Sequence, residues 1–220
     1  HITEIFAKLF FHLVEKSFAI DFKIPKRDMI SSAKLSPLVE KLLEKHSEVN
    51  KIVCVNINAG KICYLRRWPQ ENYVELILGL YHRFGIKVVL VGGEGDVGYV
   101  NDFIMKLPKK INIFNFCGEL SIKELVGLFT KSRLLITNDS GPLHIASIVG
   151  LPTVSFFGPE TPYLYGPLGP EHHVFYEDIF CSPCINIYNA KASSCNNNIC
   201  LKSISSEIVM KTIEEKNFLT

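Results

Sequence analysis

The chain has 220 residues, of which 47% are hydrophobic and 21% charged, and its formal net charge is +2 at pH 7. This length and apolar content are enough for a large domain with a real core. The small net charge gives no sign of the basic excess that nucleic-acid-binding proteins carry. No apolar run reaches the roughly 18 residues that a membrane-spanning helix needs. The chain begins with His1 rather than methionine, and we expect it to be a piece of a longer protein.

The first 48 residues form a region of their own. Residues 1–20 carry apolar side chains at helical spacing, which predicts an amphipathic helix. Residues 22–34 are irregular and charged, and we interpret them as a linker. Ser36-Pro37 then predicts a second helix reaching about Lys45, because proline is favoured at the first helical position.

From residue 51 onward, strands and helices alternate. Short apolar runs predict strands at residues 51–58, 87–93, 111–118, 133–138 and 152–158. Helical patterns lie between them at residues 69–85, 96–107, 121–132 and 142–150, with Gly85 and Gly150 as terminators and a Ser121–Glu124 capping box. Such an alternation is typical of a parallel sheet covered on both faces. We therefore predict an α/β, Rossmann-like, doubly wound domain.

Four loops follow the predicted strands and are rich in glycine, proline and small polar residues. They are Asn58–Arg67, Gly92–Asp96, Asn138–His144 and Gly158–Gly166. In open α/β sheets, ligands bind outside the carboxyl ends of the strands. We therefore expect the functional site where these loops meet.

The loop Asn138–His144 opens a helix at Pro142, after Ser140 and Gly141. A helix N-terminus carries a partial positive charge and free N–H groups, so this loop is a candidate phosphate site. Asp139 and Ser140 are also ordinary helix-capping residues, and that role alone explains them equally well. His144 comes early enough in the helix to reach a bound anion, although a lone helical histidine is more often a surface or core residue.

Two other loops add candidate ligand contacts. Lys61, Arg66 and Arg67 follow the first strand, where they form either a solvated face or a diphosphate contact. Trp68-Pro69 then anchors the next helix. The sequence "VGGEGD" lacks the dinucleotide fingerprint spacing, yet Glu94 or Asp96 could bind a ribose. Either carboxylate could equally cap the following helix.

The seven cysteines fall into two groups. Cys54 and Cys117 lie in apolar runs, where free cysteine behaves as a small hydrophobe, and Cys63 lies in a polar loop. These three unclustered cysteines favour a reducing compartment. The remaining four are Cys181, Cys184, Cys195 and Cys200. Their spacing is compatible with a tetrahedral structural zinc site, with two disulfides, or with four reduced thiols.

Taken together, the loops resemble a known family. "TNDSGPLHIASIVGLPTVSFFGPETP" (residues 137–162) is similar to the signature of glycosyltransferase family 9, the ADP-heptose:lipopolysaccharide heptosyltransferases. The sequences "NAG", "RRWP", "LVGGEGD" and "CGELSIKELVGLF" follow in the family's order, and the resemblance covers roughly residues 50–215. It implies the C-terminal Rossmann-like domain of a GT-B glycosyltransferase. Residues 49–220 would then be the donor-binding domain, with a Cys-rich loop at 181–200, and residues 1–48 the end of the N-terminal domain and linker.

The resemblance also implies roles for particular residues. Arg66 matches a basic residue on the donor diphosphate, and Glu94 or Asp96 falls where the family places an acidic residue on the ribose. Asp139, Ser140 and Gly141 match the turn at the phosphate and sugar, and His144 matches the histidine that follows it. The catalytic base is expected in the N-terminal domain, so no catalytic residue is assigned here. The chain as given should bind donor weakly and transfer nothing.

The implied reaction is metal-independent, inverting transfer of heptose from ADP-heptose to the lipopolysaccharide inner core. Catalysis would need no cofactor. The resemblance implies a location in the bacterial cytoplasm, and it is compatible with peripheral association at the inner face of the inner membrane. Three alternatives stay open: a relative that uses another nucleotide sugar, a non-catalytic nucleotide-binding module, and a small metal-binding domain centred on the cysteines.

Overall fold

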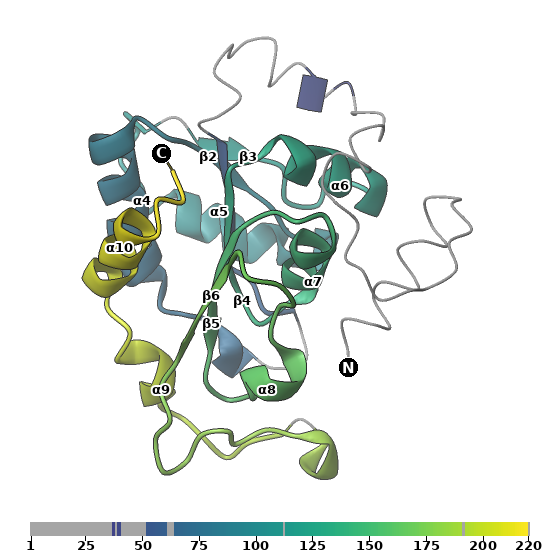
Figure 1. Cartoon of the computed structure of the whole chain (residues 1–220), viewed down its shortest axis with the longest axis vertical. Coiled ribbons are helices and arrows are strands. Elements are labelled where there is room, and N and C mark those ends of the chain that lie inside the picture. The colour runs from purple at the N-terminus through teal and green to yellow at the C-terminus, as the bar shows by residue number, and fades with distance from the viewer. Residues whose placement is uncertain are drawn as a thin grey trace.

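The computed structural model describes Pro37, Val39–Glu40, 52–60, 64–111, 113–190 and 192–219 (Figure 1). The predicted helix at residues 1–20, the linker at 22–34, Lys61 and Cys63 lie outside the described residues. Of the predicted second helix, Pro37, Val39 and Glu40 are described, and all three are helical. Val39 is fully buried and belongs to a hydrophobic cluster of the α/β domain.

A six-stranded parallel sheet, with strand order β3-β2-β1-β4-β5-β6, forms the centre of the domain. The strands are β1 (Ile52–Asn56), β2 (Lys87–Leu90), β3 (Ile113–Asn115), β4 (Leu134–Asn138), β5 (Thr153–Phe157) and β6 (His172–Tyr176). The longer helices are α4 (Gln70–Phe84), α5 (Val97–Ile104), α6 (Ile122–Lys131), α7 (Gly141–Ile148) and α10 (Ser206–Glu215). The short helical turns are η2 (Tyr64–Arg66), η3 (Glu94–Asp96), α8 (Pro162–Tyr165), η4 (Ile187–Asn189) and α9 (Ile199–Lys202). The predicted doubly wound α/β fold is confirmed.

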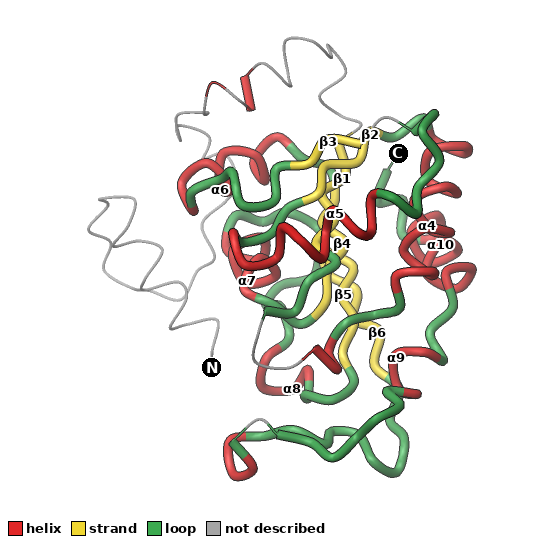
Figure 2. Tube along the Cα trace, turned by 180° about the vertical axis from the view of Figure 1, so that it is seen from behind, coloured by secondary structure: helices red, strands yellow, loops and turns green. Residues whose placement is uncertain are grey.

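Helices cover both faces of the sheet because successive strand residues point to opposite sides. Val53 and Val55 of β1 pack in one hydrophobic cluster with α4, α5 and α10. Ile52 and Cys54 of the same strand pack in a second cluster with α6 and α7. Figures 1 and 2 show the sheet edge-on between these two layers. Among the described residues, no helix is long and apolar enough to cross a membrane.

The elements agree with the sequence predictions in kind and order, and differ mainly at their ends. The Ser121–Glu124 capping box forms as expected: Oγ of Ser121 accepts from the Glu124 amide at 3.3 Å, and the Ser121 amide donates to the Glu124 carboxylate at 2.7 Å. Gly85 ends α4 in the left-handed conformation that favours glycine. Strand β6 and helix α10 lie beyond residue 158, where the sequence patterns predicted no element.

Trp68 anchors the start of α4, as the sequence analysis expected. Its indole ring is fully buried and stacks on Phe156 of β5, with 4.2 Å between ring centroids. The indole N–H donates to the carbonyl of Ile204 at 2.8 Å. The backbone N–H of Trp68 donates to Oδ1 of Asn138 at 2.9 Å. These contacts fix the loop after β1 against both β4 and the segment that precedes α10.

Two glycines, Gly92 and Gly98, give a matched test of how closely the loop after β2 packs on its neighbours. A methyl group at Gly92 would collide with Nδ2 of Asn58 and approach Sγ of Cys117 to 2.8 Å, whereas a methyl group at the exposed Gly98 meets nothing within 4 Å. We expect Gly92→Ala to lower the free energy of unfolding by about 1–3 kcal/mol. Gly98→Ala, within α5, should raise it by ~0.5 kcal/mol. Urea unfolding followed by the fluorescence of Trp68, the chain's single tryptophan, measures both; equal stability of Gly92→Ala and wild type would contradict the packing described.

Candidate functional site

The strand order reverses between β1 and β4, and a pocket of about 410 Å³ opens at the carboxyl ends of these strands. All four loops expected from the sequence reach it. Asn58–Gly60 and Arg66 come from the first loop, Gly92, Gly93 and Asp96 from the second, Asp139–Pro142 and His144 from the third, and Glu160 and Tyr165 from the fourth. Segments about 100 residues apart in the chain therefore form one site.

Arg66 and Asp139 form an ion pair across the pocket. Nη1 of Arg66 lies 3.0 Å from Oδ2 of Asp139, and the two side chains are only 16% and 6% exposed. Nη2 of Arg66 donates to the carbonyl of Ala59 at 2.8 Å. Among the described residues, Nε of Arg66 has no partner although it is buried. The pair joins η2 to the end of β4, and it largely offsets the charge of the guanidinium.

Ser140 immediately precedes α7, but its side chain does not cap the helix. Its hydroxyl accepts a hydrogen bond from Nδ2 of Asn56 at 2.8 Å and lies 2.9 Å from Oγ1 of Thr137. The alternative that this serine is explained by capping alone is therefore wrong. The hydroxyl takes part in a polar group beneath the pocket, and Gly141 and Pro142 at the start of α7 line the pocket itself.

Buried asparagines support the pocket, and the sequence analysis did not assign them a role. Asn138 is fully buried; its Oδ1 accepts from the Trp68 amide and from the Tyr73 hydroxyl, and its Nδ2 donates to the carbonyl of Asn58 at 3.1 Å. Nδ2 of Asn58 donates to the carbonyl of Val91, while its buried Oδ1 has no partner among the described residues. The available signal was the asparagine that ends each of two apolar strands, Asn56 and Asn138, where an apolar residue would be usual.

His144 lines the pocket and is only 3% exposed. Burial lowers the pKa of its imidazole to about 4, so the ring is neutral at pH 7. Its place in the pocket agrees with the expectation that it reaches a ligand. Its chemistry is that of a neutral hydrogen-bonding group, and it does not supply a positive charge.

The structure separates pairs of residues that the sequence left ambiguous. Asp96 lines the pocket, and its Oδ2 accepts from the Gly93 amide at 3.1 Å, whereas Glu94 is exposed and is not a lining residue. Of the two carboxylates, only that of Asp96 therefore belongs to the pocket lining, and its contact with a ribose stays a prediction. Likewise Arg66 lines the pocket, while the guanidinium of Arg67 lies 4.0 Å from the ring centre of Tyr99 and does not line it.

The charges of the described lining residues are unusual for an anion site. They comprise one guanidinium, on Arg66, and three carboxyl groups, on Asp96, Asp139 and Glu160. Glu160 is 3% exposed, and the sequence analysis did not single it out. Carboxylates accept hydrogen bonds from hydroxyl groups. The described lining therefore offers more hydrogen-bond acceptors for hydroxyl groups than positive charges for an anion.

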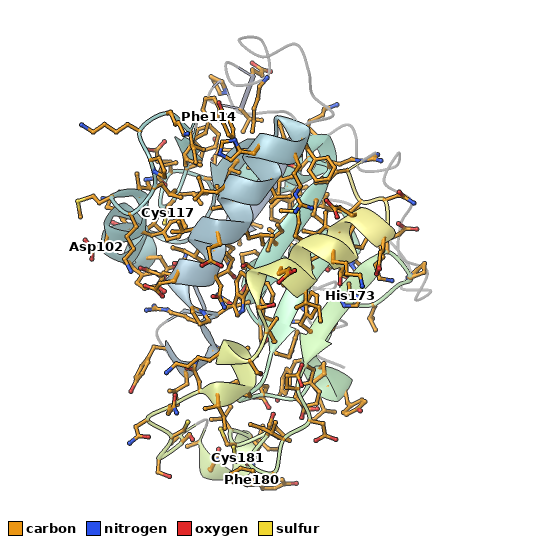
Figure 3. The ribbon with its side chains drawn as sticks, turned by 90° about the vertical axis from the view of Figure 1, so that its left-hand side faces the viewer. Asp102, Phe114, Cys117, His173, Phe180 and Cys181 are labelled. Atoms are coloured by element: carbon orange, nitrogen blue, oxygen red, sulfur yellow. The ribbon has the colours of Figure 1, made fainter. Side chains whose placement is uncertain are left out.

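The four clustered cysteines lie on a loop that extends from the sheet, with Phe180 and Cys181 near its end (Figure 3). All four are free thiols, so the two-disulfide alternative is wrong. No group of three His, Cys, Asp or Glu side chains arranged to hold a metal occurs in the part of the chain that the structure describes. Cys184 and Cys195 pack beside Leu65 and Ile185, Cys181 is exposed, and Cys200 is buried in α9, where the other three thiols are near enough to act on it electrostatically. Burial raises the pKa of Cys200 to about 11.

Comparison with known proteins identifies the family. The profile of glycosyltransferase family 9 (heptosyltransferase) matches residues 4–193. The chain belongs to glycosyltransferase family 9. The match begins well before residue 50, so it takes in the N-terminal region that the sequence analysis left outside the resemblance.

Several relatives are named as heptosyltransferases, from Salmonella typhimurium, Haemophilus influenzae and Escherichia coli among others. Lipopolysaccharide heptosyltransferase 2 of Salmonella typhimurium is 32% identical over 111 residues, which are 50% of this chain and 32% of that protein. The solved ADP-heptose LPS heptosyltransferase II of E. coli superposes with a TM-score of 0.65 at 21% identity, over 83% of this chain and 52% of that one. E. coli heptosyltransferase WaaC with ADP gives 0.57 at 17% identity, over 81% and 48%. The family 9 chain described here thus spans about half the length of these solved structures.

The pKa of His144 leads to a stability prediction. A histidine whose folded pKa is about 4 and whose unfolded pKa is 6.5 stabilises the fold above pH 6.5, and this contribution is lost as the pH falls towards 4. The free energy of unfolding of wild type should therefore fall over this interval by ~2 kcal/mol more than that of His144→Gln. Urea unfolding at several pH values measures the difference. His172, whose pKa is also lowered to about 4, is present in both proteins and cancels; parallel pH curves would contradict the prediction.

Proposed function

We propose that this chain is the donor-binding half of an inverting, metal-independent heptosyltransferase that uses ADP-heptose and acts on the lipopolysaccharide inner core. The observation that carries the proposal is the meeting of Arg66, Asp139, Ser140 and His144 in one pocket at the switch point of the sheet. Residues 49–220 would form the donor domain, and residues 1–48 the end of the acceptor domain and its linker. ADP in the WaaC structure and the name of the Salmonella relative support the choice of donor and acceptor.

The pocket offers separate groups for the phosphates and the sugars. The start of α7, the Ser140 hydroxyl and the Arg66 guanidinium provide donors for the diphosphate. Asp96 and Glu160 provide acceptors for ribose and sugar hydroxyls. Asp139 sits between the two sets, held by Arg66 at 3.0 Å. In this arrangement, a neutral His144 adds a hydrogen bond without adding charge.

The chemistry of transfer assigns these groups to the leaving side of the reaction. An acceptor hydroxyl attacks the anomeric carbon, the bond from that carbon to the diphosphate oxygen breaks, and the electron pair leaves with ADP. Negative charge therefore builds on the diphosphate, where preorganised donors stabilise the transition state more than the ground state. Arg66 and the α7 N-terminus could supply this stabilisation without a divalent ion. The acceptor's proton would go to a carboxylate base in the N-terminal half of the protein.

This division of roles determines what the chain can do alone. It would bind the nucleotide part of the donor weakly and would transfer no sugar, because both the acceptor site and the base lie in the other half. We place the whole protein in the cytoplasm, with peripheral association at the inner membrane as its means of reaching the acceptor.

The neighbouring residues Arg66 and Arg67 provide a test with a built-in control. Because Arg66 lines the pocket and Arg67 packs on Tyr99, Arg66→Gln should weaken ADP binding about 10- to 100-fold. Arg67→Gln should change it by less than about 2-fold. Isothermal titration calorimetry measures both affinities, and a thermal melt of each variant checks that it folds.

The other outcomes have distinct meanings. Binding of no adenine or uridine nucleotide by wild type would refute a nucleotide-sugar site. Binding of UDP but not ADP would support a relative that uses another nucleotide sugar. Nucleotide binding in a protein whose full reading frame encodes no upstream α/β half would favour a non-catalytic binding module.

A further inference from the structure

Ser140 is held in an unusual way for a residue at a helix start. Its backbone is extended, with φ −160° and ψ 166°, as is normal for a capping residue, yet its hydroxyl does not cap α7. The hydroxyl instead turns toward β1 and β4, where Asn56 and Thr137 contact it at 2.8 Å and 2.9 Å.

The direction of each hydrogen bond follows from the groups involved. Nδ2 of Asn56 can only donate, and it donates to both Oγ of Ser140 and Oγ1 of Thr137, the latter at 3.1 Å. The carbonyl of Asn138 can only accept, and it lies 3.0 Å from Oγ1 of Thr137. Thr137 and Ser140 each carry one hydroxyl proton, so two arrangements of the protons satisfy the contact between the two hydroxyls, and only one of them also keeps the bond from Thr137 to the Asn138 carbonyl.

In the first arrangement, Thr137 donates to the carbonyl of Asn138, and Ser140 donates to Thr137. In the second, Thr137 donates to Ser140 instead of to the Asn138 carbonyl, and the serine oxygen then accepts from both Thr137 and Asn56. The Ser140 proton is left pointing out of this group and toward the pocket. The two arrangements interconvert by rotation of two hydroxyl protons, and no heavy atom has to move.

Burial shows that Thr137 must act through Ser140. Thr137 is fully buried and is not a lining residue of the pocket, whereas Ser140 is. Asn56 lines the pocket beside Ser140 but is only 2% exposed, and its orientation is fixed because its Oδ1 accepts from the Asn58 amide at 3.2 Å. The surroundings of the serine oxygen are therefore rigid, while its proton is free to change direction.

We propose that Thr137 and Asn56 are positioning residues that make the Ser140 hydroxyl a donor to an anionic oxygen of a bound diphosphate. This inference rests on the proposed function, because the diphosphate is that of the nucleotide-sugar donor. An anionic oxygen accepts only, so it selects the second arrangement. Both acceptor positions of the serine oxygen are then filled from below, and its proton is directed at the ligand.

The experiment is a double-mutant cycle between Thr137 and Ser140, with ADP as the probe and calorimetry on the 220-residue chain. Thr137→Val keeps the β-branched shape and removes the hydroxyl, and it should weaken ADP binding roughly 3- to 10-fold. Thr137→Ser keeps the hydroxyl and should change affinity by less than about 2-fold. In the Ser140→Ala background, Thr137→Val should have almost no effect, because no serine proton remains to be directed.

The outcomes separate this inference from the proposed function. If Thr137→Val lowers ADP affinity equally in the wild-type and the Ser140→Ala backgrounds, Thr137 has a merely structural role and the inference is overturned. Unchanged binding by Thr137→Val, with Ser140→Ala impaired, would overturn it as well and leave the proposed function standing. Failure of wild type to bind ADP would overturn both. If Thr137→Val does not fold, Thr137→Ala enters the same cycle.

Discussion

The side-chain amide of Asn138 holds together the segments that meet at the carboxyl edge of the sheet. Asn138 lies at the end of β4. Its side chain bonds to Asn58 in the loop after β1, to Trp68 just before α4, and to Tyr73 in the first turn of α4. It is fully buried, and a buried amide that loses its partners costs about 1–3 kcal/mol. The relative position of these segments is thereby fixed, and both partners of the Arg66–Asp139 pair lie on segments next to it.

The pocket combines this rigid base with a described lining in which carboxyl groups outnumber cations, three to one. Its one described guanidinium is already paired with Asp139, and its histidine is neutral. Binding of an anion therefore depends on oriented hydrogen-bond donors more than on net positive charge. That is the property expected of a site that must hold a diphosphate during reaction and also recognise sugar hydroxyls. The hydrogen bonds around Ser140 are an example, because they determine the direction in which the Ser140 hydroxyl donates.

Much of this architecture could be predicted from the sequence. Short apolar strands, the capping box at Ser121 and the terminating Gly85 gave the sheet and its helices, and the rule for open α/β sheets gave the four site loops. The edge strand β6 was missed because its "HHVFY" is short and has two polar residues at its start. Helix α10 was missed because its apolar residues are few, although Ser205 caps it as the pattern would allow.

The sequence predicted which residues belong to the candidate site, but not the contacts that they make with one another. Pattern and resemblance selected Arg66, Asp139, Ser140 and His144, and each lines the pocket. That Arg66 is paired with Asp139, that Ser140 does not cap, and that His144 is neutral all depend on three-dimensional contacts and burial. The supporting asparagines carried only a weak signal, since a polar residue at a strand end is ordinarily read as the start of a loop. The cysteine spacing was compatible with zinc, with two disulfides or with four free thiols, and which of the thiols are buried depends on the tertiary structure.

The most direct test of the account is a titration of the isotopically labelled chain with ADP, followed by backbone amide chemical shifts. The account predicts the largest shifts at Asn58–Gly60, Gly92–Asp96 and Asp139–His144, the loops that line the pocket. The groove between α4 and α10, lined by residues such as Glu75 and Lys211, should be unaffected. Shifts confined to that groove, or no shifts at saturating nucleotide, would contradict a nucleotide-sugar site at the switch point of this sheet.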